Sequence, residues 1–295
     1  MRLVWSEAYE VDLFGHVFPV EKYRLIKDRL ITQGAATEAD FMRPRPAGRD
    51  DLLLVHTPEY VDDLINLRVT HRTVTSELAL TREIADAYIM AAGGTIEAAR
   101  HALSGGPGLH IGGGFHHAYP DHAEGFCYVN DVCVAIERLR SDGAVERVCV
   151  IDCDLHQGNG TAVIFAQNPD VFTFSIHQEN NYPSKERSDL DIGLADGTDD
   201  GNYLDRLNVV SEILKRHRPE IVFYLAGADP FAGDMLGGLA LTKQGLKNRD
   251  IFVFEECNKR RIPVCVVLAG GYASKVTDDV DIHSTTLLEA QRILG

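Results

Sequence analysis

The stretch VCVIDCDLHQGNGT, residues 148–161, decides the fold class and directs the search for a functional site. Its opening residues, 148–151, are an apolar run of β-formers, which predicts a strand buried on both faces. The sequence then turns polar, and because side chains alternate along a strand, Asp152, Asp154 and His156 share one side. Catalytic groups in open α/β sheets gather at the carboxyl ends of strands. Asp154 and His156 are therefore candidate metal ligands.

The rest of the chain alternates between strand and helix patterns. The predicted elements are a helix at 21–33, a strand at 109–111, a helix at 130–139, strands at 147–152 and 171–176, a helix at 203–216, a strand at 221–226, a helix at 242–257, a strand at 264–268 and a helix near 283–293. Such alternation implies parallel strands joined by right-handed crossovers. We expect an α/β fold, a three-layer sandwich with a central, mostly parallel sheet flanked by helices.

Three stretches in the first third of the chain are less regular. Residues 2–5 are expected to form an edge strand, and residues 51–55 a short strand. A long helical pattern covers 77–103 and contains Gly93 and Gly94. This glycine pair either lets another element pack closely or splits the helix.

Length and composition are those of an ordinary globular protein. The 295 residues suffice for one large α/β domain or two small ones, and because no linker is visible we expect a single catalytic domain over 1–295. The apolar runs are too short for a membrane span, and the first residues lack a secretory signal pattern. The six cysteines form no C-x-x-C pair, which is typical of reduced, buried thiols. We therefore expect a cytoplasmic protein that does not interact with membranes.

The formal charge of -15 narrows the class of partner. Binding to a nucleic-acid backbone needs clustered Lys and Arg, so direct binding of nucleic acid is not expected. Long-range attraction would favour cationic partners, such as Lys-rich peptides or polyamines. Solubility alone is an equally good reason for the excess of acidic residues.

Four polar segments follow predicted strands, and together they suggest a catalytic metal site. They are GGGFHHA at 112–118, DCDLHQGNG at 152–160, LAGADPFAGD at 225–234 and LAGGY at 268–272. Asp154, His156 and Asp229 are candidate zinc ligands, and two carboxylates with one imidazole leave a fourth position open, as in catalytic zinc sites. Alone, each motif has a simpler interpretation: a single D-x-H is usually a surface pair, and the Gly triplet lacks the Lys-Ser/Thr of a P-loop.

The adjacent His116 and His117 are candidates for acid and base. Tyr272, which follows two glycines, offers a hydroxyl for a developing oxyanion. It is the joint occurrence of these residues, in this order after strands, that favours a catalytic site over the simpler interpretations.

These segments, with GFCYVNDV at 125–132 and AGADPFAGDMLGGLALT at 226–242, resemble the zinc-dependent histone deacetylase family, which has the arginase/deacetylase fold. The resemblance runs from about His16 to the C-terminal helix. Class I members usually carry His where Gln157 stands and Asp where Asn159 stands. The HQGNG variant and the segments GHVFPVEKY at 15–23 and GTDDGNYL at 197–204 look most like class IV deacetylases and their bacterial relatives.

The resemblance implies a role for each catalytic residue. His117 would be the general base and would return a proton to the leaving amine, with Asn159 behind it. His116, held by Asp152, would stay protonated. A neutral partner leaves the pKa of His117 nearer its usual value of about 6.5, which suits a base working near neutrality. Tyr272 would donate to the tetrahedral oxyanion.

The resemblance also implies a substrate tunnel and a second ion. Phe126 would form one wall of a narrow apolar tunnel for the lysine stem, and the Gly125 carbonyl would accept from the substrate amide. Tyr182 is our candidate for the opposite wall, and Gly270 belongs to the same substrate-binding set. A structural K⁺ would lie beneath the zinc, bound by main-chain oxygens around residues 152–156 and by Ser175.

The predicted function is zinc-dependent hydrolysis of acyl-lysine side-chain amides, with an acetyl or a longer fatty acyl group, in peptides or proteins. Three alternatives stay open. An acetylpolyamine or other small amide would use the same chemistry on another cationic substrate. A ureohydrolase of the arginase type would need a second metal ion, but Gln157 and Asn159 follow His156 where another carboxylate would be wanted. A silent acyl-lysine-binding protein would be expected to have lost a ligand, His117 or Tyr272, and all are present.

Overall fold

The computed structural model describes residues 1–295 and has one eight-stranded parallel sheet, in the order β2-β1-β3-β8-β7-β4-β5-β6. The strands are β1 Leu3–Val4, β2 Phe41–Met42, β3 Gly108–His110, β4 Val148–Asp152, β5 Val171–Gln178, β6 Leu190–Leu194, β7 Ile221–Leu225 and β8 Val264–Val267. All seven strand pairs are parallel. This confirms the predicted parallel α/β sheet.

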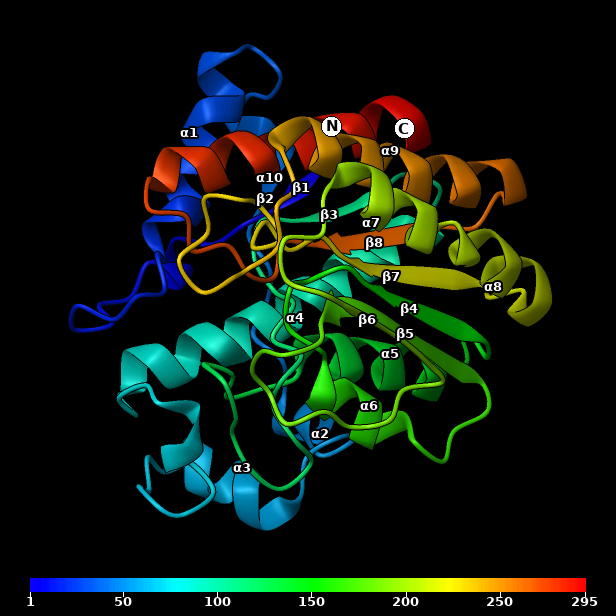
Figure 1. The fold of residues 1–295 in the computed structure, drawn as a ribbon. Helices are drawn as coiled ribbons and strands as arrows, with labels where there is room; N and C mark the ends of the chain where they lie inside the picture. The colour runs from blue at the N-terminus through cyan, green and yellow to red at the C-terminus, as the bar shows by residue number, and fades with distance from the viewer.

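Helices cover both faces of the sheet, as Figure 1 shows. Helices α4, α5 and α6 lie on one face with α2 and α3 beyond them, and α1, α10 and α9 cover the other face together with α7 and α8. The helices are α1 Glu21–Thr32, α2 Arg49–Leu52, α3 Pro58–Ile65, α4 Arg82–Leu103, α5 Asp131–Ser141, α6 Asn159–Phe165, α7 Asp200–Leu207, α8 Val209–His217, α9 Lys243–Arg260 and α10 Val276–Leu294. Short 3-10 turns lie at Glu7–Tyr9, Glu38–Asp40 and Val74–Ser76. The three-layer sandwich is thus confirmed, and no helix has the length and apolar character needed to cross a membrane.

The sheet order brings the four polar segments together. They follow β3, β4, β7 and β8, and these four strands are neighbours in the sheet, in the order β3-β8-β7-β4. Asp152 at the end of β4 pairs in register with Leu225 at the end of β7, which pairs with Val267 at the end of β8. Because parallel strands end at the same edge, the segments after them meet above one stretch of that edge.

Several local predictions were wrong where short stretches depend on tertiary contacts. Residues 51–55 do not form a strand: α2 begins at Arg49, and Asp51 stabilises its start by accepting a 2.7 Å hydrogen bond from the N–H of Gly48. Residues 2–5 do form a strand, but β1 lies inside the sheet, because the unpredicted strand β2 covers its outer edge. Strand β6 and helix α6 were also not predicted, and the predicted helix at 203–216 divides at Asn208 into α7 and α8.

The glycine pair of α4 permits close packing and does not split the helix, which is continuous from Arg82 to Leu103. A Cβ on Gly93 would lie 1.8 Å from the carbonyl oxygen of Arg45, in a segment whose Ala47 N–H donates to Ile89 of the helix. A Cβ on Gly94 would lie 2.6 Å from the side chains of Tyr9 and His110. The second of the two sequence alternatives is therefore excluded.

We predict that Gly93→Ala lowers the free energy of unfolding by about 2 kcal/mol, because the new methyl group collides with backbone that cannot rotate away. Urea unfolding followed by circular dichroism measures the change. The matched control is Gly201→Ala in α7, where the nearest atom to the new Cβ is 3.8 Å away. This control should leave stability unchanged or raise it slightly, and equal effects of the two variants would contradict the packing explanation.

Candidate active site

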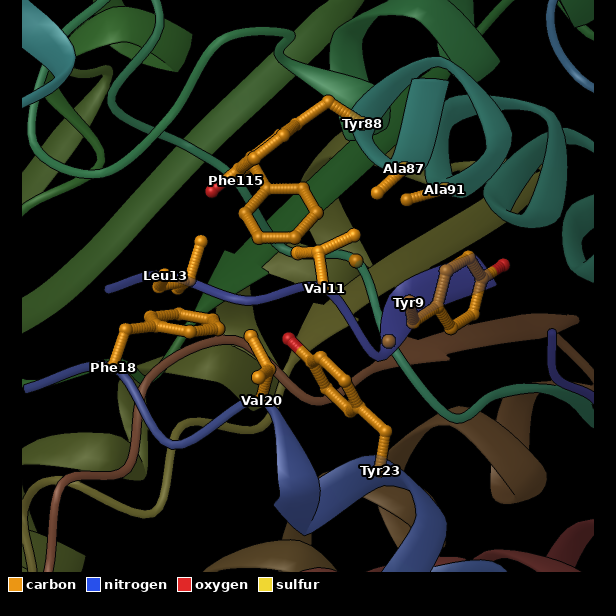
Figure 2. A pocket seen from close by; sticks show the side chains of 12 residues that line it. Tyr9, Val11, Leu13, Phe18, Val20, Tyr23, Ala87, Tyr88, Ala91 and Phe115 are labelled. Carbon is orange, nitrogen blue, oxygen red and sulfur yellow. The ribbon is translucent and has the colours of Figure 1, made fainter. Parts of the chain in front are cut away.

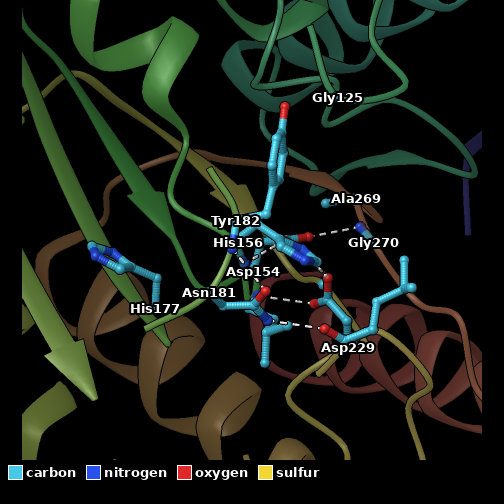
Figure 3. A network of polar contacts seen from close by, with 12 residues as sticks. Gly125, Asp154, His156, His177, Asn181, Tyr182, Asp229, Ala269 and Gly270 are labelled. Carbon is cyan, nitrogen blue, oxygen red and sulfur yellow. Dashed lines mark hydrogen bonds and ion pairs between the residues drawn. The ribbon is translucent and has the colours of Figure 1, made fainter. Parts of the chain in front are cut away.

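Asp154, His156 and Asp229 form the one group of three or more His, Cys, Asp or Glu side chains in the structure that could hold a metal ion. Their ligand atoms all lie within 4.8 Å of one another, and all three residues are buried. His156 Nδ1 is 3.3 Å from Asp154 Oδ1 and 3.2 Å from Asp229 Oδ2 (Figure 3). The structure thus brings together the three predicted ligands, which are up to 75 residues apart in the chain.

Backbone N–H groups hold the two carboxylates in place. Asp154 accepts from the N–H of His156 at 2.9 Å and from the N–H of Gly270 at 2.7 Å, and Asp229 accepts from the N–H of Leu155 at 2.9 Å. Gly270 must be glycine here, because a Cβ would lie 2.1 Å from Asp229 Oδ2. Gly270, which was placed among the substrate-binding residues, therefore supports the ligand carboxylates.

The electrostatics of this group fit a divalent transition metal. Burial, together with the nearby charge of Asp154, raises the pKa of Asp229 to about 7. Burial lowers the pKa of His156, but hydrogen bonds to Asp154 and Asp229 outweigh this and raise it to about 10. The two carboxylates thus favour a positive charge at the position of His156, which in this structure would be its added proton. Two carboxylate oxygens and one imidazole nitrogen match the donors of a catalytic zinc site, and the residues present fit that ion.

The two adjacent histidines have opposite electrostatic environments. His116 Nδ1 lies 2.7 Å from Asp152 Oδ2, and although burial lowers the pKa of His116, Asp152 and Asp154 raise it to about 9. His117 Nδ1 lies 2.7 Å from the side-chain oxygen of the neutral Asn159, and burial with the nearby charge of His116 takes its pKa well below the usual value. The pKa of His117 is therefore not near 6.5, as the neutral partner had suggested. Such a split in one pair separates an acid from a base.

The Nε2 atoms of these two histidines are 3.1 Å apart. Since the neutral His117 donates from Nδ1 to Asn159, its Nε2 carries a free lone pair, and the protonated His116 can donate to it. Asn159 in turn donates to the Tyr119 hydroxyl at 3.1 Å, so its own orientation is fixed. The structure therefore places Asp152 and Asn159 behind His116 and His117, respectively.

Tyr272 is buried beside the ligand group. Its ring centre lies 6.4 Å from that of His156 and 6.0 Å from that of Phe126. Burial raises the pKa of its hydroxyl well above the usual value, as do the carboxylates of Asp154 and Asp229, so the hydroxyl stays a donor. Its backbone N–H donates to Asp234 at 2.7 Å, which anchors the loop.

A cavity of about 220 Å³ leads from the surface to these groups, and it is lined by His117, Phe126, His156, Tyr182 and Tyr272 among others. Phe126 and Tyr182 both lie on it. The Tyr182 hydroxyl donates to Glu124 at 2.8 Å, and its ring centre is 5.3 Å from that of His117. Gly125, next to Phe126, also lines this mouth. The three residues expected along a substrate tunnel thus border one opening.

Two further cavities are much smaller, each of about 20 Å³. The inner one adjoins the ligand group and is lined by residues that include His116, Asp154 and Tyr272. The apolar one has ten hydrophobic residues among the twelve that line it (Figure 2). Phe18 and Phe115 line both cavities, so these two rings lie between them.

Sequence reasoning missed two buried residues that hold the catalytic loops. The Asp131 carboxylate accepts from the N–H groups of Gly114 at 3.0 Å and Phe115 at 2.7 Å, which positions the two histidines that follow. Its place at the start of a helix after Asn130 was a usable signal. The ammonium group of Lys22 is fully buried in α1 and donates to the carbonyl oxygen of Ala269 at 3.0 Å. Nothing in the helix pattern distinguishes Lys22 from an exposed lysine.

A comparison with known families identifies a histone deacetylase domain over residues 16–287. An uncharacterized protein of Picosynechococcus is 40% identical over 272 residues, which cover 91% of each chain. Histone deacetylase 2 of Arabidopsis thaliana is 30% identical, over 92% of this chain and 74% of its own length. The acetoin utilization protein AcuC of Bacillus subtilis is 30% identical, over 81% of this chain and 68% of its own.

Solved structures resemble this chain over nearly its whole length. The crystal structure of a histone deacetylase homologue complexed with the compound SAHA superposes with a TM-score of 0.86 at 25% identity, and covers 99% of this chain and 84% of that one. A homologue from Aquifex aeolicus gives the same TM-score, identity and coverage.

A buried histidine near the site, His56, makes the stability of the protein depend on pH. This side chain is buried, its Nδ1 lies 2.9 Å from the Tyr119 carbonyl oxygen, and its Nε2 accepts from the N–H of Asn130. Burial lowers its pKa to about 4. As the pH falls, His56 is protonated in the unfolded chain before it is protonated in the folded protein. Its contribution to the free energy of unfolding is therefore complete above a pH of about 6.5 and is lost as the pH falls toward 4.

We predict that lowering the pH from 7 to 5 costs the metal-free protein about 2 kcal/mol through this one group. Urea unfolding in the presence of a chelator at the two pH values measures it, and His56→Gln should lose less stability by about that amount. The exposed His71, changed to Gln, is the control and should behave as wild type. The same pH dependence in His56→Gln and wild type would contradict the assignment.

Proposed function

This chain belongs to the histone deacetylase family and is a deacetylase, and on that premise we propose that it removes acetyl groups from lysine side chains by zinc-dependent hydrolysis. One observation carries the proposal. The buried Asp154, His156 and Asp229 adjoin a histidine pair of split pKa and a protonated tyrosine at the inner end of an open cavity. Closer kinship with class IV deacetylases stays a prediction.

Asp154, His156 and Asp229 would hold the zinc ion. When bound, zinc supplies a Lewis acid that polarises an amide carbonyl and lowers the pKa of a water molecule. His156 must give up its proton to bind the ion, so we expect metal affinity to fall at acidic pH. The predicted K⁺ also stays a prediction: Ser175 pairs in register with Asp152, and its hydroxyl is 2.9 Å from His177 Nδ1.

The residues around the metal ligands divide the proton transfers between them. The low pKa of His117 keeps its Nε2 unprotonated, so that this atom could exchange its contact with His116 for a water molecule, take a proton from it and then deliver one to the leaving lysine nitrogen. His116, held by Asp152, stays cationic and favours the developing negative charge. The Tyr272 hydroxyl, which burial keeps protonated, would donate to the oxyanion.

The mouth of the site suits a lysine side chain. Phe126 and Tyr182 provide aromatic surface for the four-carbon stem, and the Gly125 carbonyl would accept from the substrate amide N–H. Glu77 lines the same cavity, and Glu124 accepts from Tyr182, so the opening is acidic. An acidic mouth favours cationic substrates, which are Lys-rich peptides or, as the second candidate, acetylpolyamines.

The inner cavity favours a small acyl group. Its volume is only about 20 Å³, and Asp154 and His156, which would hold the metal ion, form part of its lining, so no more than a group of methyl size would fit there. Phe18 and Phe115 separate this space from the apolar cavity beyond. A longer fatty acyl chain would have to displace one of these rings. We therefore propose acetyl as the preferred group.

An arginase-type reaction has less support. It needs a second metal ion, and the structure contains only one group of three or more metal-binding side chains. Gln157, which follows His156, donates instead to the Glu186 carbonyl at 2.6 Å and to the Asp191 carboxylate at 2.7 Å. The side chain of Gln157 is therefore already engaged at the position where a second metal ion would need another ligand.

The first test is turnover of peptides carrying acetyl-, butyryl-, octanoyl- and myristoyl-lysine, with acetylputrescine and arginine alongside. We predict that zinc-loaded protein hydrolyses acetyl-lysine best, and that Tyr272→Phe lowers kcat about 10²- to 10³-fold, as expected when an oxyanion donor is removed. The zinc dissociation constant should not change. Tyr182→Phe is the control and should affect KM more than kcat. Activity on acetylputrescine or arginine, with none on the peptides, would contradict the proposal that acyl-lysine is the substrate.

A second prediction concerns the acyl group. Phe18→Ala should join the two small cavities and raise the ratio of kcat/KM for octanoyl- over acetyl-lysine by about tenfold, the usual effect of a few apolar contacts. Adding Ala91→Leu should cancel the gain, because Ala91 lines the apolar cavity only. Steady-state kinetics of the two variants measure both effects. An unchanged ratio of the two kcat/KM values in Phe18→Ala would show that Phe18 does not limit the length of the acyl group.

A further inference from the structure

The two segments that carry the ligands leave the sheet side by side and then separate. Strands β4 and β7 pair up to Asp152 and Leu225, and one more backbone bond joins the N–H of Cys153 to the Leu225 carbonyl at 3.1 Å. Beyond this point the segment after β7 bonds to β8, through the N–H of Ala226 and the carbonyl of Val267. Two strands must diverge here so that Asp154 and Asp229 can face one another.

This divergence leaves two buried carbonyl oxygens without a backbone donor. No backbone N–H donates to the carbonyl of Cys153, which precedes Asp154, or to that of Gly227, two residues before Asp229. Both residues lie in fully buried segments. A buried carbonyl without a donor costs about 1–3 kcal/mol, so a side chain is needed at this place.

Arg249 supplies that donor to both carbonyls at once. Its Nη1 donates to the Cys153 carbonyl oxygen at 3.1 Å and to the Gly227 carbonyl oxygen at 2.7 Å. The residue comes from α9 and its side chain is completely buried. One nitrogen atom therefore joins the two ligand-bearing segments at the point where the sheet no longer does.

The guanidinium is itself held by a buried network. Its Nε donates to Asp250 Oδ1 at 2.9 Å, and the same carboxylate accepts from the Tyr224 hydroxyl of β7 and the Thr286 hydroxyl of α10, both at 2.5 Å. Donors from β7 and α10 thus fix Asp250, which in turn fixes Arg249. A buried charge with so many partners has little freedom to move.

We propose that Arg249 is a positioning residue that sets the separation of the two ligand-bearing segments, and thereby the affinity and geometry of the metal site. This inference rests on the proposed metal-dependent function. Arg249 has no contact with the ligand side chains themselves, so it acts through the backbone on either side of them. Lysine is a poor replacement, because a single ammonium cannot donate to both carbonyls and also pair with Asp250 as the guanidinium fork does.

The test compares Arg249→Met with wild type by two readouts besides activity. The first is the zinc dissociation constant, measured by competition with a chelator at 25 °C on protein shown to be folded by circular dichroism. The second is the visible absorption spectrum of the Co²⁺-substituted protein, which reports the coordination geometry. We expect the zinc dissociation constant to rise about 10- to 100-fold, as for other residues that orient metal ligands, and the cobalt bands to shift.

The matched control lies on the same helix. Arg260 also pairs with a carboxylate, that of Glu256, and donates to the Ser211 carbonyl at 3.1 Å. Arg260→Met should lower the melting temperature while zinc affinity and the cobalt spectrum stay as in wild type. Where Arg249→Met does not fold, Arg249→Lys decides by the same readouts.

The outcomes separate this inference from the proposed function. Wild-type zinc affinity and an unchanged cobalt spectrum in the folded Arg249 variant would overturn the positioning role. Equal losses of zinc affinity in the Arg249 and Arg260 variants would overturn it too, because they would show a general effect of stability. Failure of wild-type protein to bind zinc would contradict the proposed function instead.

Discussion

The structure depends on holding two carboxylates and an imidazole close together out of water. Asp154 and Asp229 repel one another, and burial makes that repulsion stronger and removes the solvent that would screen it. The fold offsets this cost with backbone donors, since Leu155, His156 and Gly270 all direct N–H groups at the two carboxylates. The remaining negative charge attracts a cation, which is the electrostatic basis of the proposed metal binding.

The same low dielectric lets small chemical differences shift the pKa values of two adjacent histidines in opposite directions. His116 and His117 are adjacent, both buried and 3.1 Å apart at Nε2, yet one faces a carboxylate and the other an amide. In water this difference would shift their pKa values modestly, but in the interior it separates a cation from a neutral base. The loop that carries both is fixed by Asp131, so neither ring can exchange its partner without moving the backbone.

The substrate space is graded in the same way, from an acidic mouth through aromatic walls to a cavity of methyl size. Glu77 and Glu124 lie at the opening, Phe126 and Tyr182 along it, and Phe18 and Phe115 close its inner end. This order of environments is the basis on which we propose a cationic amine with a small acyl group as the substrate. On this proposal, acyl length depends on Phe18 and Phe115 rather than on the proposed catalytic residues.

The sequence by itself determined the α/β class and the candidate metal ligands, because both follow local patterns, and the family motifs supplied the other candidate site residues. Alternating strands and helices specify parallel pairing, and the spacing of Asp152, Asp154 and His156 past a strand end specifies one shared side. Only the tertiary structure decided the strand order β3-β8-β7-β4, which brings Asp229 to Asp154. In the helix patterns of the sequence, Lys22 and Arg249 look like exposed cations. The tertiary structure buries both of them beside carbonyl oxygens that lack backbone donors. Those needs arise from contacts between segments distant in the chain, and no local pattern records them.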